Sequence, residues 1–387
     1  MMNQPVINKK MIMGNTETKA VWKAAKKHYS RRRRHGQSAK GKPLKGTLLK
    51  VVQASPTDHK VIEMNSDVTV AAPIGSVTKE SLIESLKSVN LRGMSGNSFP
   101  VYQKLEAFAE VESAEQSVLL VNAVECDPGL VHDEWLVKSH FEEIKQGIIA
   151  IKHAFGIKRA ILAMKAVRRE DASISVMFQS EEIEVCRVPA RYPAGEEHFL
   201  IQSTLGMELP KSELPVRHGI LVMNVQTLWQ ISRLINGTFD GGHYITVADV
   251  KRGIAKPAYV YPETKITDLL NKAFGQKNVQ EYQCVSGGGI MDSHEVGVEE
   301  QCTEKISFAA YLPTAFAAVL SNQNRCKGCG ACSHKCPAGI DVRKIVSLRE
   351  ENPNADISLY HPEACLHCGS CTWFCHGNKI PELYVNQ

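Results

Sequence analysis

The chain has 387 residues, a formal net charge of +5 and 43% hydrophobic residues, enough for two or three domains with their own cores. No apolar run reaches the roughly 18 residues of a membrane span, and the apolar stretch AAYLPTAFAAVL at 309–320 is short and contains a proline. These features exclude a helical membrane-spanning protein, so we expect a soluble or membrane-peripheral one.

Basic residues crowd the N-terminal segment. The first fifty residues hold fourteen Lys or Arg and one acid, Glu17, and the densest run is RRRRH at 31–35. No apolar stretch follows this run, so it does not read as a secretion signal. It could bind nucleic acid or an anionic membrane. Because few aromatics accompany it, we favour a solvated, partly disordered tail or a docking arm for an acidic partner. We assign 1–70 to this segment, which ends in a vestigial β region.

From about residue 70, strand and helix patterns alternate. Short apolar runs predict buried strands at 117–125, 159–166, 183–189 and 219–225. Amphipathic spacing predicts helices, each ending at a glycine, at 141–156, 195–206 and 227–237. This alternation predicts a doubly wound α/β domain over 71–244, with ligand-binding loops at the carboxyl ends of its strands.

The pattern changes over 245–311, where short strands surround one predicted helix. We expect a small α+β unit of β-grasp type. The glycine turn SGGG at 286–289 could let the backbone approach a ligand or a cluster, and a tight hairpin is the equal alternative.

Two cysteine-rich cassettes, CKGCGACSHKCPAGI at 326–340 and CLHCGSCTWFCHGNKI at 365–380, occupy the C-terminal unit, 312–387. Three closely spaced cysteines wrap a loop around one corner of a cubic [4Fe–4S] cluster, and the fourth ligand comes from the other cassette. We therefore expect two clusters, one held by Cys326, Cys329, Cys332 and Cys375 and one by Cys336, Cys365, Cys368 and Cys371. Zinc sites usually lack the third cysteine, and disulfides would need an oxidising compartment.

Four middle segments carry a resemblance to a known family: LRGMSGNSFPVYQKL (91–105), LLVNAVECDPGLVHDEWL (119–136), RYPAGEEHFLIQSTLG (191–206) and GILVMNVQTLW (219–229). Together they resemble the C subunit of the Rnf-type electron transport complex, itself related to the NADH- and flavin-binding subunit of respiratory complex I. A cobalamin-reducing flavoprotein and the electron-transfer protein associated with proline reductase are similar as well. The resemblance runs from about residue 75 to the C-terminus.

The resemblance implies a glycine-rich loop that cradles the phosphate of FMN with backbone N–H groups. Here the loop runs from Gly93 to Pro100, with serine in place of two glycines, and Lys104 would offset the phosphate charge. The implied flavin-site residues are Gly93, Ser95, Gly96, Ser98, Lys104, Asn122, Glu125, Asp127, Tyr192, Gly195, Glu196, Asn224 and Thr227. The alternative is that the polar members of this set only cap helices.

A flavin accepts two electrons as a hydride and a cluster carries one, so a chain that holds both converts between the two. The resemblance implies an oxidoreductase of the NADH dehydrogenase or electron-transfer class. It would pass electrons from NADH or another donor through FMN and both clusters to a terminal reductase or a ferredoxin. Only a trace remains of the N-terminal β-domain of the Rnf-type protein, so we expect a specialised cytoplasmic relative that can associate peripherally with the inner face of a membrane.

Two alternatives stay open. An adaptor with an empty flavin site would relay electrons between proteins through its clusters alone. An iron–sulfur nucleic-acid-binding protein would use the basic run at 31–34 and would show a steep salt dependence of binding. We expect nucleic acid not to be a partner, and we assign no residue a catalytic role.

Overall fold

The structure is a computed structural model that describes most of the chain beyond residue 60. The described ranges are 61–65, 70–94, 98–110, 117–127, 129–166, 176–178, 182–189, 191–210, 213–291, 293–297, 299–314 and 324–386. The basic run at 31–34 and the loop residues Ser95 and Gly96 lie outside these ranges, so the predictions made for them stay predictions.

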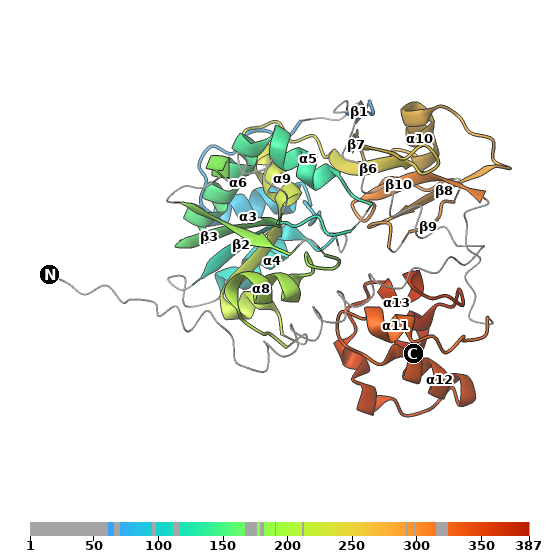
Figure 1. The fold of residues 1–387 in the computed structure, drawn as a ribbon. Coiled ribbons are helices and arrows are strands. Elements are labelled where there is room, and N and C mark those ends of the chain that lie inside the picture. The colour runs from blue at the N-terminus through green and yellow to red at the C-terminus, as the bar shows by residue number, and fades with distance from the viewer. Residues whose placement is uncertain are drawn as a thin grey trace.

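Figure 1 shows three parts: an α/β unit, a second sheet beside it, and a helical C-terminal unit below. The α/β unit contains a four-stranded parallel sheet of order β4-β3-β2-β5. Its strands are β2 (Val118–Ala123), β3 (Arg159–Lys165), β4 (Ile183–Val188) and β5 (Ile220–Asn224). In this order the winding direction reverses between β2 and β5. A doubly wound sheet binds its ligand in the crevice at the carboxyl ends of such a strand pair.

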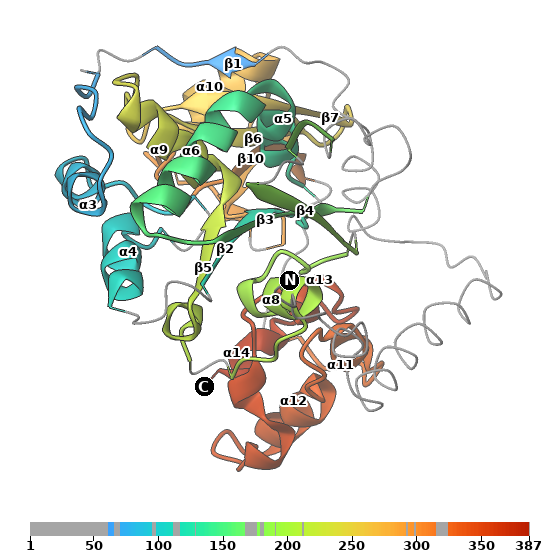
Figure 2. The ribbon, with the colours of Figure 1, turned by 90° about the vertical axis from the view of Figure 1, so that its left-hand side faces the viewer.

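Helices cover both faces of the parallel sheet, as the alternating pattern predicted. One face packs against α3 (Lys79–Ser88), α4 (Val101–Ala109), α5 (His132–Ser139), α6 (Phe141–Ala154) and α9 (Val225–Ile235). The other face packs against α8 (Glu197–Leu205). Figure 2 shows α6 and α9 running side by side over the strands.

Apolar spacing explains how α6 meets the sheet. Ile144, Ile148 and Ile151 recur at intervals of four and three residues, and all three are fully buried. On the same helix, a Cβ added to Gly147 would lie 2.1 Å from the Leu228 carbonyl oxygen of α9. Glycine therefore permits the close contact between α6 and α9.

The second sheet is mixed and has six strands in the order β1-β7-β6-β10-β8-β9. They are β1 (Ile62–Glu63), β6 (His243–Asp249), β7 (Ile254–Val260), β8 (Tyr282–Gly287), β9 (His294–Glu295) and β10 (Phe308–Pro313). The helix α10 (Ile266–Phe274) packs on one face, and the other face meets loops of the α/β unit and the C-terminal unit. One helix among short strands agrees with the expected pattern, and the β-grasp assignment remains a prediction.

The C-terminal unit has a small core built around its cysteines. Its helices are α11 (Ala331–Lys335), α12 (Val342–Glu351), α13 (Ser370–Trp373) and α14 (Pro381–Val385), with 3-10 turns at Ser358–Tyr360 and Pro362–Ala364. Buried residues such as Ile345 and Val346 of α12 pack with Cys332 and against several half-buried cysteines. These few apolar groups form only a small core for a unit of this size. Domains with such small cores commonly depend on bound metal for stability.

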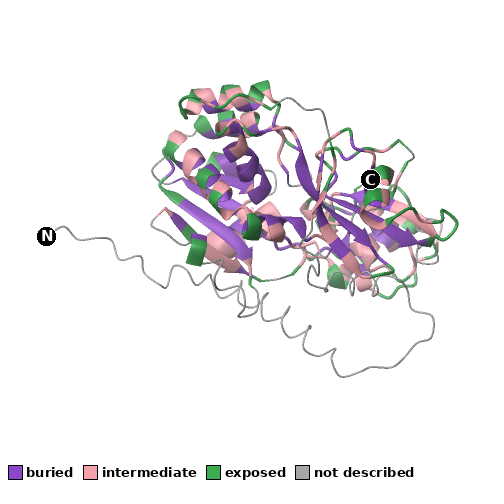
Figure 3. Ribbon diagram, turned by 90° about the horizontal axis from the view of Figure 1, so that it is seen from above, coloured by how far each residue is buried: buried purple, intermediate pink, exposed green. Residues whose placement is uncertain are grey.

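Figure 3 shows buried residues concentrated along the strands of both sheets and exposed residues on the outer turns of the helices. In the part of the chain that the structure describes, none of the helices combines the length and the apolar character needed to cross a bilayer.

Candidate functional site

A cavity of about 200 Å³ opens at the carboxyl end of β5, at the predicted crevice. Its walls are mainly apolar. Its lining includes four residues of the implied flavin site, Gly93, Lys104, Asn224 and Thr227, together with Phe99 of the glycine-rich loop. We call this the β5 cavity. It places the glycine-rich loop, the lysine after it and the end of β5 around one space.

The glycine-rich loop closes back on itself before α4. Gly93 N–H donates to the Phe99 carbonyl oxygen at 2.8 Å, and Arg92 Nη1 donates to the Ser98 carbonyl oxygen at 3.2 Å. Ser98 is buried and has a φ of +51°, in the left-handed region that favours glycine. This conformation costs a residue with a side chain about 1–2 kcal/mol. Ser98 therefore has the backbone conformation that suits the glycine expected at this position.

Lys104 projects from α4 toward α8. Its Nζ lies 3.0 Å from Glu197 Oε1, and both side chains keep roughly 30% exposure. A phosphate group at the start of α4 would compete with Glu197 for this ammonium group. The loop, the helix N-terminus and the lysine form the kind of site that binds phosphate.

Two implied residues, Glu196 and Asn224, cap helices. The Glu196 carboxylate accepts from the N–H groups of His198 and Phe199 at the start of α8. The Asn224 side chain accepts from the N–H of Gln226 at 2.7 Å at the start of α9. These are the contacts of the capping alternative, and Asn224 makes its contact while it also lines the β5 cavity.

Thr227 links α9 to the glycine-rich loop. It lies inside α9, and its Oγ1 accepts from the Met94 N–H at 3.0 Å in a buried hydrogen bond. Since Thr227 also lines the β5 cavity, it holds one side of the loop against the helix at the cavity wall.

Asn122 and Gly195 join the end of β2 to the loop before α8. Asn122 Nδ2 donates to the Gly195 carbonyl oxygen at 2.8 Å, and its Oδ1 accepts from Val124 N–H at 3.0 Å. A Cβ on Gly195 would lie 2.4 Å from the Val124 carbonyl oxygen. Glycine is therefore required here by a contact between two backbone segments.

A buried cluster of ionisable groups lies beside the crevice. Glu125 accepts from the N–H groups of Asp133 and Glu134 at the start of α5, and His132 Nδ1 lies 3.5 Å from its carboxylate. Burial, reinforced by the charge of Asp133, raises the pKa of Glu125 to about 8, and Lys165 partly opposes the rise. Burial also raises the pKa of Asp133 and lowers the pKa of His132. The cluster can therefore hold a proton near neutral pH.

The sequence prediction did not include His132 and Asp133. The available signal was HDE, three polar residues at the start of an amphipathic helix just after the Glu125 loop. Asn224 Nδ2 donates to Asp133 Oδ2 at 2.8 Å, so one hydrogen bond connects this cluster to a residue that lines the β5 cavity.

Asp127 lies away from the β5 cavity and bonds the glycine turn of the second sheet. Its carboxylate accepts from the N–H groups of Gly129 at 2.9 Å, Ile290 at 3.0 Å and Met291 at 3.2 Å. A Cβ on Gly289 would lie 2.3 Å from Asp127 Oδ2. At this turn the backbone therefore closely approaches the carboxylate of another segment of the chain, which the sequence did not predict.

Tyr192 connects the α/β unit to the C-terminal unit. Its hydroxyl donates to the Cys368 carbonyl oxygen at 2.6 Å. Its ring packs on an apolar cluster that contains the buried Met291. Trp373 and Phe374 of the second cassette pack on the same cluster. The loop before α8 thus lies directly against the second cassette.

Six of the eight cassette thiols lie in two groups of three. Burial raises the pKa of Cys332, and Cys375 and Cys326 add to the rise, so these three lie together. Burial likewise raises the pKa of Cys336, and Cys368 and Cys365 add to it. No disulfide forms among the cysteines of the described part of the chain.

Backbone N–H groups also point at the sulfurs. Gly328 N–H donates to Cys326 Sγ, and Lys379 N–H donates to Cys375 Sγ, both at 3.4 Å. Hydrogen bonds of this kind tune cluster potentials. Grouped thiols that receive N–H donors fit two [4Fe–4S] clusters, and the assignment of each ligand remains a prediction.

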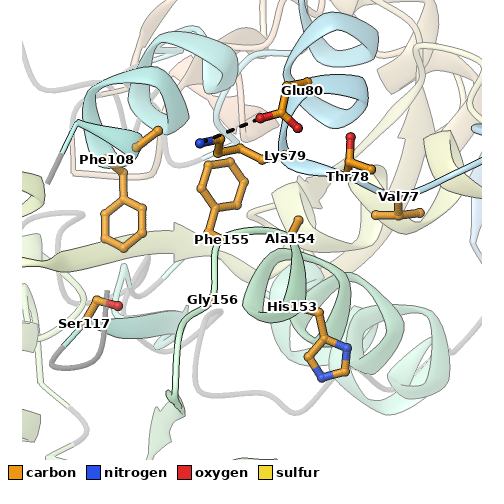
Figure 4. Close-up of a pocket in the computed structure, with 11 residues that line it drawn as sticks. Val77, Thr78, Lys79, Glu80, Phe108, Ser117, His153, Ala154, Phe155 and Gly156 are labelled. Carbon is orange, nitrogen blue, oxygen red and sulfur yellow. Dashed lines mark ion pairs between the residues drawn. The ribbon is translucent and has the colours of Figure 1, made fainter. Parts of the chain in front are cut away.

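A second cavity, of about 540 Å³, lies at the opposite edge of the parallel sheet. Figure 4 shows its lining residues, with Ser117 from the amino end of β2, Phe155 and His153 from the end of α6, and the Lys79–Glu80 ion pair of α3. Ligands of doubly wound sheets bind at the carboxyl edge. Despite its larger volume, this cavity is therefore not the candidate site.

Comparisons with known proteins match two parts of the chain separately. Residues 86–233 match the family model described as the Nuo51 FMN-binding domain, and residues 318–376 match the 4Fe-4S dicluster domain. The first match contains all thirteen implied flavin-site residues, and the second contains all eight cassette cysteines. The chain therefore carries an FMN-binding domain and a dicluster domain, and FMN and two [4Fe–4S] clusters are its cofactors.

Curated relatives support the resemblance seen in the sequence. The chain is 28% identical over 270 residues to the C subunit of the ion-translocating oxidoreductase complex of Vibrio cholerae (strain O395), covering 68% of this chain and 34% of that protein. The corresponding protein of Haemophilus influenzae (strain Rd) is 24% identical over 275 residues, covering 70% and 33%. The resemblance to the Rnf-type protein is thus confirmed, and the chain spans about a third of the length of these relatives.

A solved structure shares the fold. The NAD+-reducing [NiFe]-hydrogenase in its H2-reduced state superposes with a TM-score of 0.53 at 17% identity, covering 81% of this chain and 63% of that one. At this identity the likeness establishes a common architecture alone.

Proposed function

We propose that this relative of the ion-translocating oxidoreductase C subunits takes electrons from a hydride donor, NADH, and passes them to a one-electron partner such as a terminal reductase or ferredoxin. The observation that carries the proposal is the bond from Tyr192 to the Cys368 carbonyl, because it joins the crevice side of the α/β unit to the second cassette. When bound, FMN supplies two-electron chemistry and the clusters supply one-electron chemistry.

The β5 cavity would bind the flavin. The N–H groups at the N-terminus of α4 would bind the phosphate, and Lys104 would leave Glu197 to pair with it. The mainly apolar walls would exclude water from the ring. Thr227 would keep the loop in place through its bond to Met94.

The buried cluster would handle the proton that accompanies hydride chemistry. Burial raises the pKa of Glu125 to about 8, so its carboxyl group can hold a proton at neutral pH. Asp133 bonds to Asn224, which lines the cavity. A proton held at Glu125 or Asp133 would therefore lie close to the flavin cavity. From Asp133, a single hydrogen bond leads to Asn224 in the cavity lining.

The choice of NADH is supported by two findings. The first is the match to a domain described as belonging to Nuo51, and the second is the fold shared with an NAD+-reducing hydrogenase. The curated relatives belong to ion-translocating complexes. We propose a cytoplasmic location, with peripheral attachment to the inner face of a membrane through partner proteins.

A specific observation favours a second candidate, a relay that takes electrons from a protein donor. The β5 cavity of about 200 Å³ is smaller than the roughly 300–1,000 Å³ of typical small-molecule sites. Lys104 already pairs with Glu197 at 3.0 Å. A flavin that needs this pair to open would bind more weakly than one that enters a preformed site.

Anaerobic purification followed by iron, sulfide and FMN counts, and then NADH addition monitored by electron paramagnetic resonance, tests the proposal. We expect about eight irons and one FMN per chain, and cluster signals that grow on NADH addition. Lys104→Gln should lower retained FMN, while Lys158→Gln, at an exposed position before β3, should not. Clusters that dithionite reduces and NADH does not would reject NADH as donor and favour the relay.

A further inference from the structure

Charge divides the C-terminal unit between its two cassettes. Residues 324–349, which contain the first cassette, hold one acid, Asp341, and six basic residues: Arg325, Lys327, Lys335, Arg343, Lys344 and Arg349. Residues 350–386, which contain the second cassette, hold one basic residue, Lys379, and five acids: Glu350, Glu351, Asp356, Glu363 and Glu382. The positive charge therefore gathers around the first cassette.

Five of the six basic side chains are exposed, and we call them the basic face: Arg325, Lys327, Lys335, Arg343 and Lys344. Among the residues that the structure describes, no acid forms an ion pair with any of them, as the pairs of this unit involve other residues. Arg343 lies beside Gly330, and Lys327 lies beside Gly377. Gly330 directly follows Cys329, and Gly377 lies two residues after Cys375. The two charges therefore flank the first group of thiols.

The first cassette also has its loop open to solvent. Cys329 and the adjoining Gly328 are exposed, whereas the cysteines of the second group are all half-buried. Gly328 has a φ of +63° and no atom within 4 Å of an added Cβ, so nothing in the described part of the chain covers the loop at this point. A partner could approach closely here, because no bulky side chain stands over the turn.

The second cassette faces the rest of the protein. A Cβ on Gly369 would lie 2.8 Å from the Met291 carbonyl oxygen, and Tyr192 bonds to the neighbouring Cys368 carbonyl. Figure 1 shows α13 on the side of the C-terminal unit nearer the sheets and α12, which carries Arg343 and Lys344, on the far side. The second cassette thus packs against the rest of the protein, while the loop of the first cassette leaves Cys329 exposed.

We propose that the basic face is the docking surface for an acidic one-electron carrier protein, which takes electrons from the cluster of Cys326, Cys329, Cys332 and Cys375. The second cluster then receives electrons from the α/β unit and the first releases them. This inference rests on the proposed function only in requiring loaded clusters. In each event the reduced cluster loses one electron and the oxidised carrier gains it, with no bond made or broken and no proton moved.

Charge complementarity is the reason for choosing an acidic carrier. A cluster of like charges steers a partner of opposite charge and speeds its association. An anionic lipid surface would also be attracted, but it would not use the exposed cysteine loop at the centre of the basic face. The location of the charges around an open cluster loop therefore favours an electron carrier.

The test uses the full chain with its clusters loaded under anaerobic conditions and an acidic [2Fe–2S] ferredoxin as the probe. One variant reverses three charges of the basic face, Lys327→Glu, Arg343→Glu and Lys344→Glu. Its control reverses three exposed charges elsewhere, Lys158→Glu, Arg252→Glu and Lys305→Glu. The net charge changes equally in both, and calorimetric titration at low and high salt measures the Kd.

We expect the unaltered chain and the control to bind the probe, with an affinity that falls as salt rises. The basic-face variant should bind at least about tenfold more weakly, while its iron content and its dithionite-reduced spectrum stay unchanged. Equal affinity in the variant and the control would overturn the proposal. Binding of phosphatidylglycerol vesicles that the variant loses, with no binding of the probe by any form, would overturn it in favour of a lipid-facing surface.

This outcome is independent of the electron donor. The clusters are reduced with dithionite, so a chain that ignores NADH but binds and reduces the probe would sink the proposed donor and keep the docking surface. If NADH reduces the clusters but the basic-face variant and the control bind the probe equally well, the proposed donor stands and the docking surface is wrong.

Discussion

Replacement of Gly289 by alanine should loosen the junction between the α/β unit and the second sheet. The added Cβ would lie 2.3 Å from Asp127 Oδ2 and 2.6 Å from its Cγ, well inside contact distance. Asp127 would have to rotate away. Its bonds to the N–H groups of Ile290 and Met291, at 3.0 and 3.2 Å, would then weaken or break.

Two effects set the size of the change. Overfilling a packed contact typically costs about 1–3 kcal/mol. Each hydrogen bond to a charged group contributes about 1.5–3 kcal/mol when well formed, and less here because Asp127 is only half-buried. We expect a local loss of about 2–4 kcal/mol, and every 1.4 kcal/mol corresponds to a factor of about ten in an opening equilibrium.

Hydrogen exchange measures this loss where it occurs. The amides of Ile290 and Met291 should exchange at least about 25-fold faster in Gly289→Ala. Gly297→Ala is the matched control, because it lies in the same unit and its Cβ would meet nothing within 4 Å. If the two variants show the same exchange at Ile290 and Met291, the account of the Asp127 contact is wrong.

Three further changes test other parts of the site. Tyr192→Phe removes a hydrogen bond worth about 1 kcal/mol, and exchange at the amides after Cys368 should rise several-fold while iron content stays constant. Cys375→Ser and Cys336→Ser should each leave about four irons and abolish a different cluster signal in electron paramagnetic resonance; loss of the same signal in both would contradict the crossed ligation. The folded-state pKa of Glu125, about 8, lies above the ordinary 4.5, so its contribution to stability is complete below pH 4.5 and is lost as the pH rises to 8. The melting temperature of the wild type relative to Glu125→Gln should therefore fall across that range, and a constant difference would refute the raised pKa.

Local features of this protein could be read from the sequence because neighbouring residues determine them. The spacing of Cys326, Cys329 and Cys332 defines a loop that closes on one cluster corner whatever surrounds it. The alternation of apolar runs and amphipathic segments predicted the four parallel strands and the helices α6, α8 and α9 to within a few residues, but it did not predict α3, α4 and α5. Hydrophobic period depends only on which face is buried, so a single chain segment carries the signal.

Other features depended on contacts between distant segments. Asp127 meets Ile290 across 163 positions, and Asn224 meets Asp133 across 91. Ser98 looked like a substituted phosphate-loop residue, but only the folded backbone shows that it lies in the left-handed region.

The orientation of the cassettes was decided in the same way. Their spacing predicts two clusters, but it does not say which cluster faces the sheets. The contacts of Tyr192 with Cys368 and of Met291 with Gly369 place the second cassette inward and leave Cys329 exposed. The sequence alone determined which residues can hold clusters, since ligand spacing is local. The tertiary structure decided the inner and outer positions, since they depend on the surface against which the C-terminal unit packs.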